Sequence, residues 1–318
     1  MEYRPLGRTG LKISKLSLGG SALGRAVTPA DEAEAVRTVH LALDLGINLI
    51  DTSPLYGTTR AETVLGMGLR GLRRDRYILA TKVGRYGLRD FNFSAERVTR
   101  SFDESCARLG VDTIDLLHCH DIEFGDLNQI VEETLPALVK LRQAGKIRFI
   151  GITGLPLKIF PAILDRVPAG TVDVILSYCH YNLNDDTLTG IIPRLKAAGV
   201  GIIHAAPTGL GMLTEAGPPD WHFAPQRIKD GCKVAVDYCR ARGVDIVKMC
   251  VQFSTANPDI TTTLIGTNQS EEIRRDVAYA DAPIDPKLLA EVRATLRPIS
   301  NHNFSSGGLP ENQDAVIA

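Results

Sequence analysis

The sequence predicts a single α/β domain spanning residues 1–318, folded as a (β/α)8 barrel of the TIM type. Eight short apolar runs alternate with amphipathic helical patterns. The runs are almost continuously apolar, as expected for parallel strands buried on both faces. The length also suits a barrel, which commonly forms one unit of about 250 residues or more. An open doubly wound sheet is the alternative, but it rarely needs eight repeats and gathers its sites at one switch point.

The elements follow the chain in a regular order. A hairpin comes first, because Leu6-Gly7-Arg8-Thr9-Gly10-Leu11 places glycine-rich turn chemistry between β-prone segments. The predicted strands are 16–18, 47–51, 77–82, 114–120, 148–153, 174–178, 200–204 and 263–266. The predicted helices are 31–45, 95–109, 128–144, 157–165, 186–198 and 227–256, the last long enough for two. The polar, glycine-rich tail from Pro298 is expected either to be disordered or to lie over the barrel mouth.

Composition narrows the class of protein. The net charge of −1 argues against nucleic acid as the main partner. The chain has no apolar signal core at its start and no run that approaches the length of a membrane span. Its six cysteines contain no C-x-x-C pair, which favours free thiols in a reducing compartment. We therefore expect a cytoplasmic protein, monomeric or weakly homo-oligomeric, with a small-molecule partner and no membrane partner.

One glycine-rich segment imitates a nucleotide-binding motif. Gly66-Met67-Gly68-Leu69-Arg70-Gly71 matches G-x-G-x-x-G, but that motif requires a strand before it and a helix after it. Here a helical pattern from Ala61 leads into the glycines. The segment is therefore interpreted as a helix end followed by a turn.

Four polar residues at strand ends form the candidate catalytic site. Asp51, Lys82 and His120 each close an apolar run, and Tyr56 follows the first run after a proline turn. In a barrel these strand ends meet at one mouth. A lysine ammonium beside a tyrosine favours the phenolate, and a carboxylate beside the lysine keeps it charged and in place. A histidine across the pocket can orient a substrate oxygen, so the set suits proton transfer coupled to hydride transfer.

The strand carrying His120 offers a second histidine. His118 and His120 are two residues apart and therefore share one strand face, so periodicity cannot choose between them, although His120 is nearer the carboxyl end. Either could instead be a satisfied core histidine. A zinc site using His118, His120 and Asp121 is the other alternative, but it lacks a well-spaced further ligand, and no metal is expected.

These motifs resemble the aldo-keto reductases. The resemblance rests on Asp-Thr-Ser-x-x-Tyr-Gly at 51–57, Thr-Lys at 81–82, Asp-Leu-Leu-His-Cys-His at 115–120 and the opening Leu-Gly-Arg-Thr-Gly. It implies that Asp51, Tyr56, Lys82 and His120 are the catalytic tetrad, which selects His120 over His118. Longer stretches at 116–125, 148–157, 170–181 and 213–222 are similar to one branch of the family, the plant-type L-galactose dehydrogenases. The branch implies NAD-dependent oxidation of an aldose at C1, L-galactose to L-galactono-1,4-lactone, with Tyr56 as general base. The alternatives are a related L-fucose or D-threo-aldose/D-arabinose 1-dehydrogenase and a general aldehyde reductase.

The resemblance also implies cofactor and sugar contacts. Where many members carry Ser-Asn, this chain has Thr153-Gly154, so only Thr153 remains as a donor to the nicotinamide, and Tyr178 replaces a glutamine. The usual stacking aromatic is Ala205, which suggests a different packing of the nicotinamide. Further expected cofactor contacts are Gly20, the backbone at Ala206, Thr208 and Leu210, and Gly266, Thr267, Glu272 and Asp276. Expected sugar contacts are Tyr56, His120, Trp221, Asn303 and Phe304.

The adenosine end of the site predicts NAD rather than NADP. NADP-using relatives carry a lysine at the position of Gly266 and an arginine at that of Glu272 to hold the 2′-phosphate. An acidic side chain can instead accept a hydrogen bond from a free ribose hydroxyl. Arg274 and Arg275 could approach a phosphate, but their helical positions face away from that of Glu272.

Overall fold

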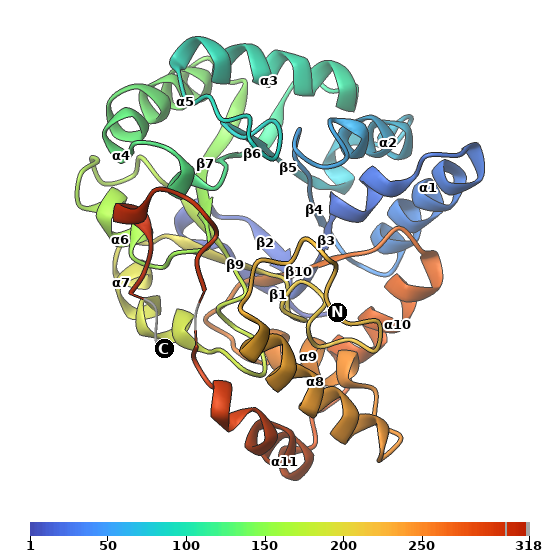
Figure 1. Cartoon of the computed structure of the whole chain (residues 1–318). Coiled ribbons are helices and arrows are strands. Elements are labelled where there is room, and N and C mark those ends of the chain that lie inside the picture. The colour runs from blue at the N-terminus through green and yellow to red at the C-terminus, as the bar shows by residue number, and fades with distance from the viewer. Residues whose placement is uncertain (303, 316–318) are drawn as a thin grey trace.

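Eight parallel strands close into a barrel in the computed structural model of the chain, which describes residues 1–302 and 304–315 (Figure 1). The strands neighbour one another in chain order, and β10 closes the ring by pairing with both β9 and β3. They are β3 (Leu16–Gly19), β4 (Leu49–Asp51), β5 (Ile78–Val83), β6 (Ile114–Cys119), β7 (Ile147–Gly154), β8 (Val174–Tyr178), β9 (Gly201–Ala205) and β10 (Thr262–Gly266). The predicted (β/α)8 barrel is confirmed, and each strand falls on a predicted apolar run.

The helices surround the barrel. They are α1 (Pro29–Asp44), α2 (Arg60–Leu69), α3 (Ala95–Leu109), α4 (Leu127–Gln129), α5 (Leu135–Gln143), α6 (Ile159–Leu164), α7 (Ile192–Ala197), α8 (Gln226–Arg240), α9 (Ile246–Ala256), α10 (Ser270–Asp281) and α11 (Pro286–Leu296). Local signals set their starts: Thr28 and Asp31 form a reciprocal capping box at α1, and Ser94 caps α3. The region 227–256 contains two helices, as expected. Helix α11 was not predicted, although Asp285 followed by Pro286 is a recognisable start signal.

The predicted helix 128–144 is interrupted in the structure. A π-helical segment (Ile130–Thr134) lies between α4 and α5. Pro136 has no backbone N–H to donate to the preceding turn, and the Leu135 N–H bonds instead to the carbonyl of Ile130, five residues back. The predicted helix 186–198 likewise divides into a 3-10 turn (Thr187–Gly190) and the short helix α7.

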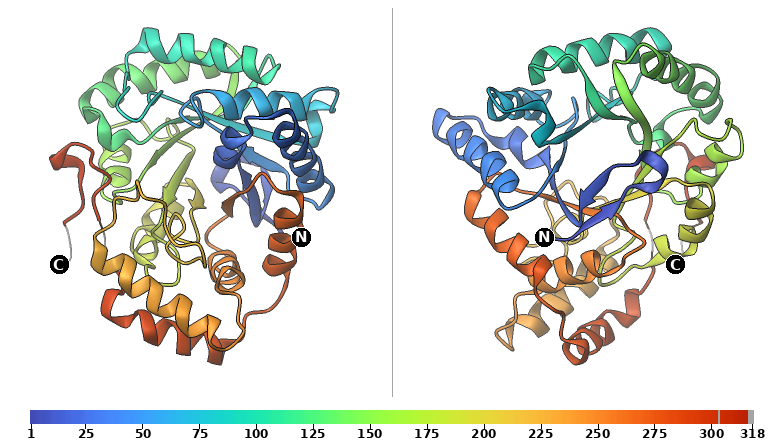
Figure 2. Two further views of the ribbon diagram at one scale, coloured as in Figure 1. Left: turned by 45° about the vertical axis from the view of Figure 1, so that its right-hand side comes forward. Right: turned by 180° about the vertical axis from the view of Figure 1, so that it is seen from behind.

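Apolar side chains fill the barrel interior, and the N-terminal hairpin closes one end of it. Strands β1 (Tyr3–Pro5) and β2 (Lys12–Ser14) pair antiparallel, as predicted. Leu6 and Ile13 of this hairpin join the cluster formed by the inward residues of the strands, among them Leu49 and Leu116. The rear view shows the hairpin across that end of the barrel (Figure 2). The opposite end, where the strands have their carboxyl ends, remains available for a site.

The described part of the C-terminal tail packs against loops at this open end. The backbone N–H of Leu309 and the side-chain amide of Asn312 donate to the carbonyl oxygen of Glu123, at 2.9 and 3.1 Å. The carboxylate of Asp314 accepts from the backbone N–H groups of Leu157 and Lys158. Of the two expectations for the tail, the structure therefore favours docking over disorder for residues 304–315. No helix in the described ranges is both long and apolar enough to cross a membrane.

Candidate active site

The loop after β4 places Asp51 and Tyr56 at the barrel mouth. Asp51 is the last residue of the strand and is 2% exposed, whereas Tyr56 is partly exposed. The loop can turn tightly because Gly57 has a φ of +60°. A Cβ at Gly57 would lie only 2.5 Å from the carbonyl oxygen of Gly24, so the two loops approach as only glycine allows. This close approach of the Gly57 and Gly24 backbones sets the position of Tyr56 at the mouth.

Lys82 contacts Asp51 and Thr52 at the start of this loop and Tyr56 further along it. Its side chain is 1% exposed, and its ammonium forms an ion pair with Asp51 and donates a 2.7 Å hydrogen bond to the carbonyl oxygen of Thr52. The same nitrogen lies 4.9 Å from the centre of the Tyr56 ring. Burial alone would lower the pKa of Lys82, but Asp51 and Tyr56 raise it above its usual value. The lysine is therefore a buried cation held against the tyrosine.

The pKa of Tyr56 differs from the simple expectation that a neighbouring lysine lowers it. Desolvation at the mouth raises the pKa of Tyr56, and the opposing effect of Lys82 only partly offsets this increase. Asp51 and Asp121 add to the increase. Tyr56 therefore carries its proton at neutral pH in this structure. A role as a base requires its deprotonated form, and Lys82 is the cation placed to stabilise that form.

His120 faces Tyr56 across the mouth. Their rings meet edge to face with centroids 5.9 Å apart. His120 Nδ1 lies 3.1 Å from the hydroxyl oxygen of Ser53, and Nε2 lies 3.6 Å from a carboxylate oxygen of Asp121. Burial lowers the pKa of His120 to about 3, despite the opposing effect of Asp121, so the imidazole is neutral at pH 7.

His118 lies deeper in the barrel than His120. It is fully buried, and its Nε2 is 3.9 Å from Asp51 Oδ2, too far for a hydrogen bond. A Cβ at Gly151 would lie 2.1 Å from His118 Nδ1, so the glycine provides the space for this ring. Of the two histidines, only His120 has its ring against Tyr56 among the ring contacts of the described residues.

Backbone strain accumulates around the mouth. Asp121, Cys179 and Ala206 directly follow β6, β8 and β9 or lie one residue beyond, and each has a positive φ, between 47° and 65°. Such conformations cost non-glycine residues about 1–3 kcal/mol each and cluster at functional sites. Their position at the carboxyl ends of the strands supports this end of the barrel as the site.

Small residues end three neighbouring strands on one side of the mouth. The neighbouring strands β9, β10 and β3 end in Ala205, Gly266 and Gly19, which carry little or no side chain. A Cβ on the adjacent Gly20 would lie 3.0 Å from the carbonyl oxygen of Asp51. The glycines therefore let neighbouring backbone segments pack closely beside the Asp51–Lys82 pair, and the residues present, with no bulky side chain at these strand ends, fit a nicotinamide.

The two expected nicotinamide contacts differ in availability. Tyr178 ends β8 and is partly exposed at the mouth. The hydroxyl of Thr153, by contrast, is already engaged: it accepts from the Asp121 N–H at 2.9 Å and donates to Asp121 Oδ1 at 3.1 Å. In this structure Thr153 holds the loop after β6, and its expected role as a donor to the cofactor remains a prediction.

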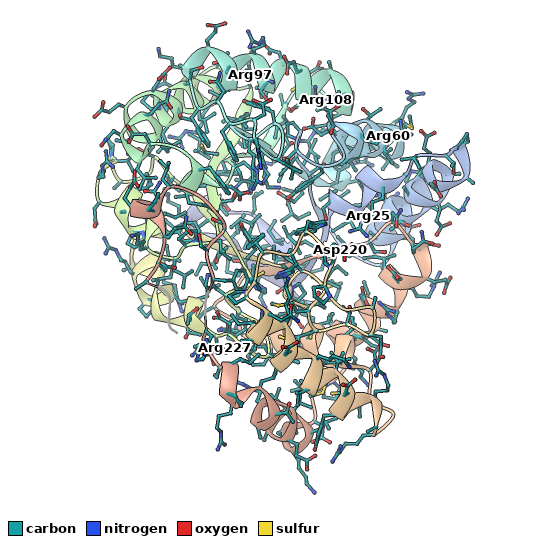
Figure 3. The ribbon with its side chains drawn as sticks, viewed as in Figure 1. Arg25, Arg60, Arg97, Arg108, Asp220 and Arg227 are labelled. Atoms are coloured by element: carbon teal, nitrogen blue, oxygen red, sulfur yellow. The ribbon has the colours of Figure 1, made fainter. Side chains whose placement is uncertain are left out.

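The long loop after β9 carries the remaining mouth candidates. Ala206 and Leu210 have positive φ values of 59° and 54°, which turn the backbone sharply on either side of Thr208. Asp220, in the same loop, is labelled to the right of the barrel centre in the view of Figure 3, below Arg25. Trp221, however, is 62% exposed and stacks on His222, so the structure does not place it among the buried mouth residues. Its expected contact with the sugar remains a prediction.

The tail residues expected to reach the sugar can be placed only in part. Phe304 packs edge to face against His222 and Phe223, with centroid distances of 5.8 and 5.5 Å. It therefore joins the tail to the loop after β9. Asn303 lies outside the described residues.

Acidic residues surround the start of α10, where the adenosine end of the cofactor was expected. Glu34 accepts hydrogen bonds from the backbone N–H and the hydroxyl of Ser270 at 2.7 and 2.6 Å, and these bonds lower its pKa to about 2. Glu272 accepts a hydrogen bond from Thr267, next to Gly266, which is exposed. Asp276 is buried, and burial raises its pKa to about 6.

Sequence reasoning missed three polar groups at the mouth. Ser53 contacts His120, and Arg85 forms an ion pair with Asp121 while lying over the rings of Phe91 and Phe124. Glu123 is also buried there, and burial raises its pKa to about 8. For Ser53, Arg85 and Glu123, closeness in sequence to a strand end was the one available signal of a place at the mouth. Asp121 shares that signal, but its sequence position suggests only a metal ligand.

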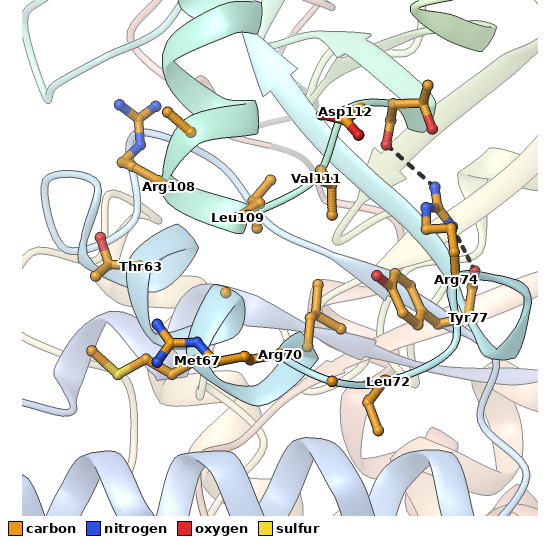
Figure 4. Close-up of a pocket in the computed structure, with 16 residues that line it drawn as sticks. Thr63, Met67, Arg70, Leu72, Arg74, Tyr77, Arg108, Leu109, Val111 and Asp112 are labelled. Carbon is orange, nitrogen blue, oxygen red and sulfur yellow. Dashed lines mark hydrogen bonds between the residues drawn. The ribbon is translucent and has the colours of Figure 1, made fainter.

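The glycine-rich segment 66–71 lies elsewhere. It lines a pocket of about 490 Å³ between the carboxyl ends of α2 and α3, where Arg74 donates to the carbonyl oxygens of Tyr77 and Thr113 (Figure 4). Helix α2 contains Gly66 and Gly68 and ends at Leu69, shortly before Gly71, and helices that run back along the barrel end at the face opposite the strands' carboxyl ends. The predicted helix end is confirmed, and the segment does not lead into the helix N-terminus that a pyrophosphate requires.

Comparison with known proteins agrees with this geometry. Residues 15–297 match the family model described as the aldo/keto reductase family. The chain is 52% identical to L-galactose dehydrogenase from Arabidopsis thaliana, over 96% of this chain and 98% of that protein. It is 30% identical to D-arabinose 1-dehydrogenase from Saccharomyces cerevisiae, over 82% of this chain and 81% of that protein. An aldo-keto reductase from Bacillus halodurans, solved in its holo form, superposes with a TM-score of 0.76 at 25% identity, covering 99% of this chain and all of the other. The chain belongs to the aldo/keto reductase family.

Proposed function

We propose that this oxidoreductase oxidises an aldose at C1 with NAD, the preferred substrate being L-galactose and the product L-galactono-1,4-lactone. The observation that carries the proposal is the buried Lys82 ammonium, which contacts Asp51 and lies against Tyr56 while His120 faces the same tyrosine. The similarity to a plant L-galactose dehydrogenase over nearly the whole chain supports the choice of sugar.

Each residue of the tetrad has a distinct part in this reaction. Tyr56 takes the proton of the anomeric hydroxyl while hydride leaves C1, so the C1–H bond breaks as the C1=O bond forms. The nicotinamide, when bound, accepts that hydride. Lys82 stabilises the phenolate form of Tyr56, and Asp51 keeps the lysine charged. His120, neutral at pH 7, orients the sugar oxygen without carrying the transferred proton.

As a member of this family the chain uses a nicotinamide cofactor, and the acidic surroundings of α10 support NAD. Glu34 already occupies the Ser270 N–H, and Glu272 would repel a 2′-phosphate. The two arginines that could oppose this preference face acids on their own helix. Arg275 pairs with Asp276 at 3.1 Å, and Arg274 lies 4.0 Å from Glu271.

The Tyr56→Phe variant tests the catalytic assignment. It should retain folding and cofactor binding while turnover of L-galactose falls below a few per cent of the wild-type rate. Cofactor titration by fluorescence quenching provides the control. Turnover above that level would contradict the assignment of Tyr56 as the general base.

A double variant tests the cofactor assignment. Wild type should have a higher kcat/KM with NAD, and Gly266→Lys combined with Glu272→Arg should move the preference towards NADP. A wild-type preference for NADP, or no movement in the double variant, would show that the adenosine site is elsewhere.

The second candidate is oxidation of a different aldose, L-fucose or D-arabinose. The similarity to a D-arabinose 1-dehydrogenase favours it. A panel of aldoses assayed for reduced-nicotinamide absorbance with each cofactor separates the two sugars, and aldehyde substrates in the reverse direction test for a general reductase.

A further inference from the structure

The hydroxyl of Ser53 is the only side-chain hydrogen-bond partner of His120 within the described ranges. Ser53 is fully buried, and its Oγ lies 3.1 Å from His120 Nδ1. The same oxygen accepts a 3.1 Å hydrogen bond from the backbone N–H of Leu55. The loop that carries Tyr56 therefore also holds the histidine opposite, through a residue with no catalytic chemistry of its own.

A neutral imidazole has one donor and one acceptor nitrogen, and its neighbours decide which is which. His120 is 3% exposed and neutral at pH 7. If Nδ1 carried the proton, it would donate to Ser53 Oγ, which already accepts from Leu55. The buried hydroxyl proton of Ser53 would then need another acceptor, and no such bond exists among the described residues. If the hydroxyl donates to Nδ1 instead, both Nδ1 and the Ser53 hydroxyl are satisfied, which is the arrangement that buried polar groups adopt.

The surroundings of the other ring nitrogen favour the same arrangement. His120 Nε2 lies 3.6 Å from Asp121 Oδ2, too far for a good hydrogen bond but close enough for the carboxylate to favour a proton on Nε2. Asp121 is itself ion-paired with Arg85, and Lys82 is the other cation near His120. These cations oppose a second proton on the ring, so the histidine remains a neutral donor.

We propose that Ser53 is a positioning residue that holds His120 in the Nε2–H tautomer, so that Nε2 donates a hydrogen bond to the sugar oxygen that Tyr56 deprotonates. Removing the serine hydroxyl leaves Nδ1 without its donor and allows the proton to move between the two nitrogens. A histidine protonated on Nδ1 presents an acceptor to the substrate and cannot stabilise the negative charge that develops on the sugar oxygen. This inference rests on the proposed function for its catalytic meaning, but not for the tautomer itself.

The test combines a spectroscopic and a kinetic readout on the full chain. Nitrogen-15 labelling of the seven histidines, with His120 assigned by its absence in His120→Asn, reports which ring nitrogen is protonated in the free protein. Wild type should show a protonated Nε2, Ser53→Ala should show a mixture, and Ser53→Thr, which keeps the hydroxyl, should restore the wild-type tautomer. Wild type with a protonated Nδ1, or Ser53→Ala with an unchanged tautomer, would overturn the proposal.

The kinetic readout separates this role from a structural one. Losing one oriented hydrogen bond should lower kcat/KM for the sugar roughly tenfold in Ser53→Ala, with recovery in Ser53→Thr. Cofactor affinity and the unfolding midpoint should remain close to wild type in both. A decrease in kcat/KM of equal size in both variants would contradict a role through the hydroxyl. Because the tautomer is measured without substrate, failure of the sugar assignment would leave the spectroscopic result intact.

Discussion

Replacing Lys82 with methionine should abolish most sugar oxidation at neutral pH by raising the pKa of Tyr56. The lysine nitrogen lies 4.9 Å from the centre of the Tyr56 ring. At an effective dielectric constant of about 20, unit charges at that distance interact with about 3 kcal/mol, which corresponds to about 2 pKa units. Desolvation already raises this pKa, and Lys82 is the group that opposes the increase.

The direction of the pH dependence follows from the form of Tyr56 that reacts. The base is the phenolate, whose fraction increases with pH, so wild-type oxidation should become faster towards alkaline pH. In Lys82→Met that increase should shift by about 2 pH units to higher pH, and turnover at neutral pH should fall roughly 100-fold. Steady-state kcat measured across pH with saturating cofactor and sugar checks both expectations.

Loss of the lysine also leaves a buried carboxylate unpaired, so stability needs a matched control. Removing one partner of a buried pair costs about 3–5 kcal/mol, whereas removing both charges costs less. The double variant Asp51→Asn, Lys82→Met should therefore recover much of the unfolding free energy in urea but none of the activity. Lys82→Met with more than a tenth of wild-type turnover at neutral pH, or with an unshifted profile, would refute the reasoning.

Three further changes test other parts of the molecule. His120→Ala should impair turnover and weaken sugar binding but spare cofactor affinity; a strong decrease in affinity by fluorescence titration would contradict a role confined to the sugar. Removing residues 304–318, or the milder Asn312→Ala, should raise the KM for sugar, because the tail docks on a mouth loop, and an unchanged value would mean that the tail does not cover the pocket. Glu62→Ala should lower the unfolding free energy by about 3 kcal/mol without changing kcat, since it leaves Arg108 without its buried partner; Glu62→Gln is the size-matched control, measured by urea denaturation.

The sequence by itself determined the barrel architecture and the positions of the catalytic tetrad at or just after the strand ends. The eight apolar runs correspond to the eight strands because burial on both faces leaves a continuous signal that does not depend on distant parts of the chain. Closure of a parallel barrel brings all the strand ends to one rim, so Asp51, Lys82 and His120 could be expected to converge before any distance was known. The interrupted helices were harder to predict, since the proline within 128–144 allowed either a break or a local π turn.

Tertiary structure alone decided which polar groups touch. The serine of Asp-Thr-Ser is an ordinary turn residue in sequence, and only the distance from Ser53 to Nδ1 of His120 gives it a role. Thr153 has the chemistry of a cofactor donor, yet its hydroxyl bonds to Asp121, and Trp221 proved to be exposed. Hydrogen bonds and pKa shifts change over a few ångströms, whereas sequence patterns specify a face or a strand end and not the contacts that form there.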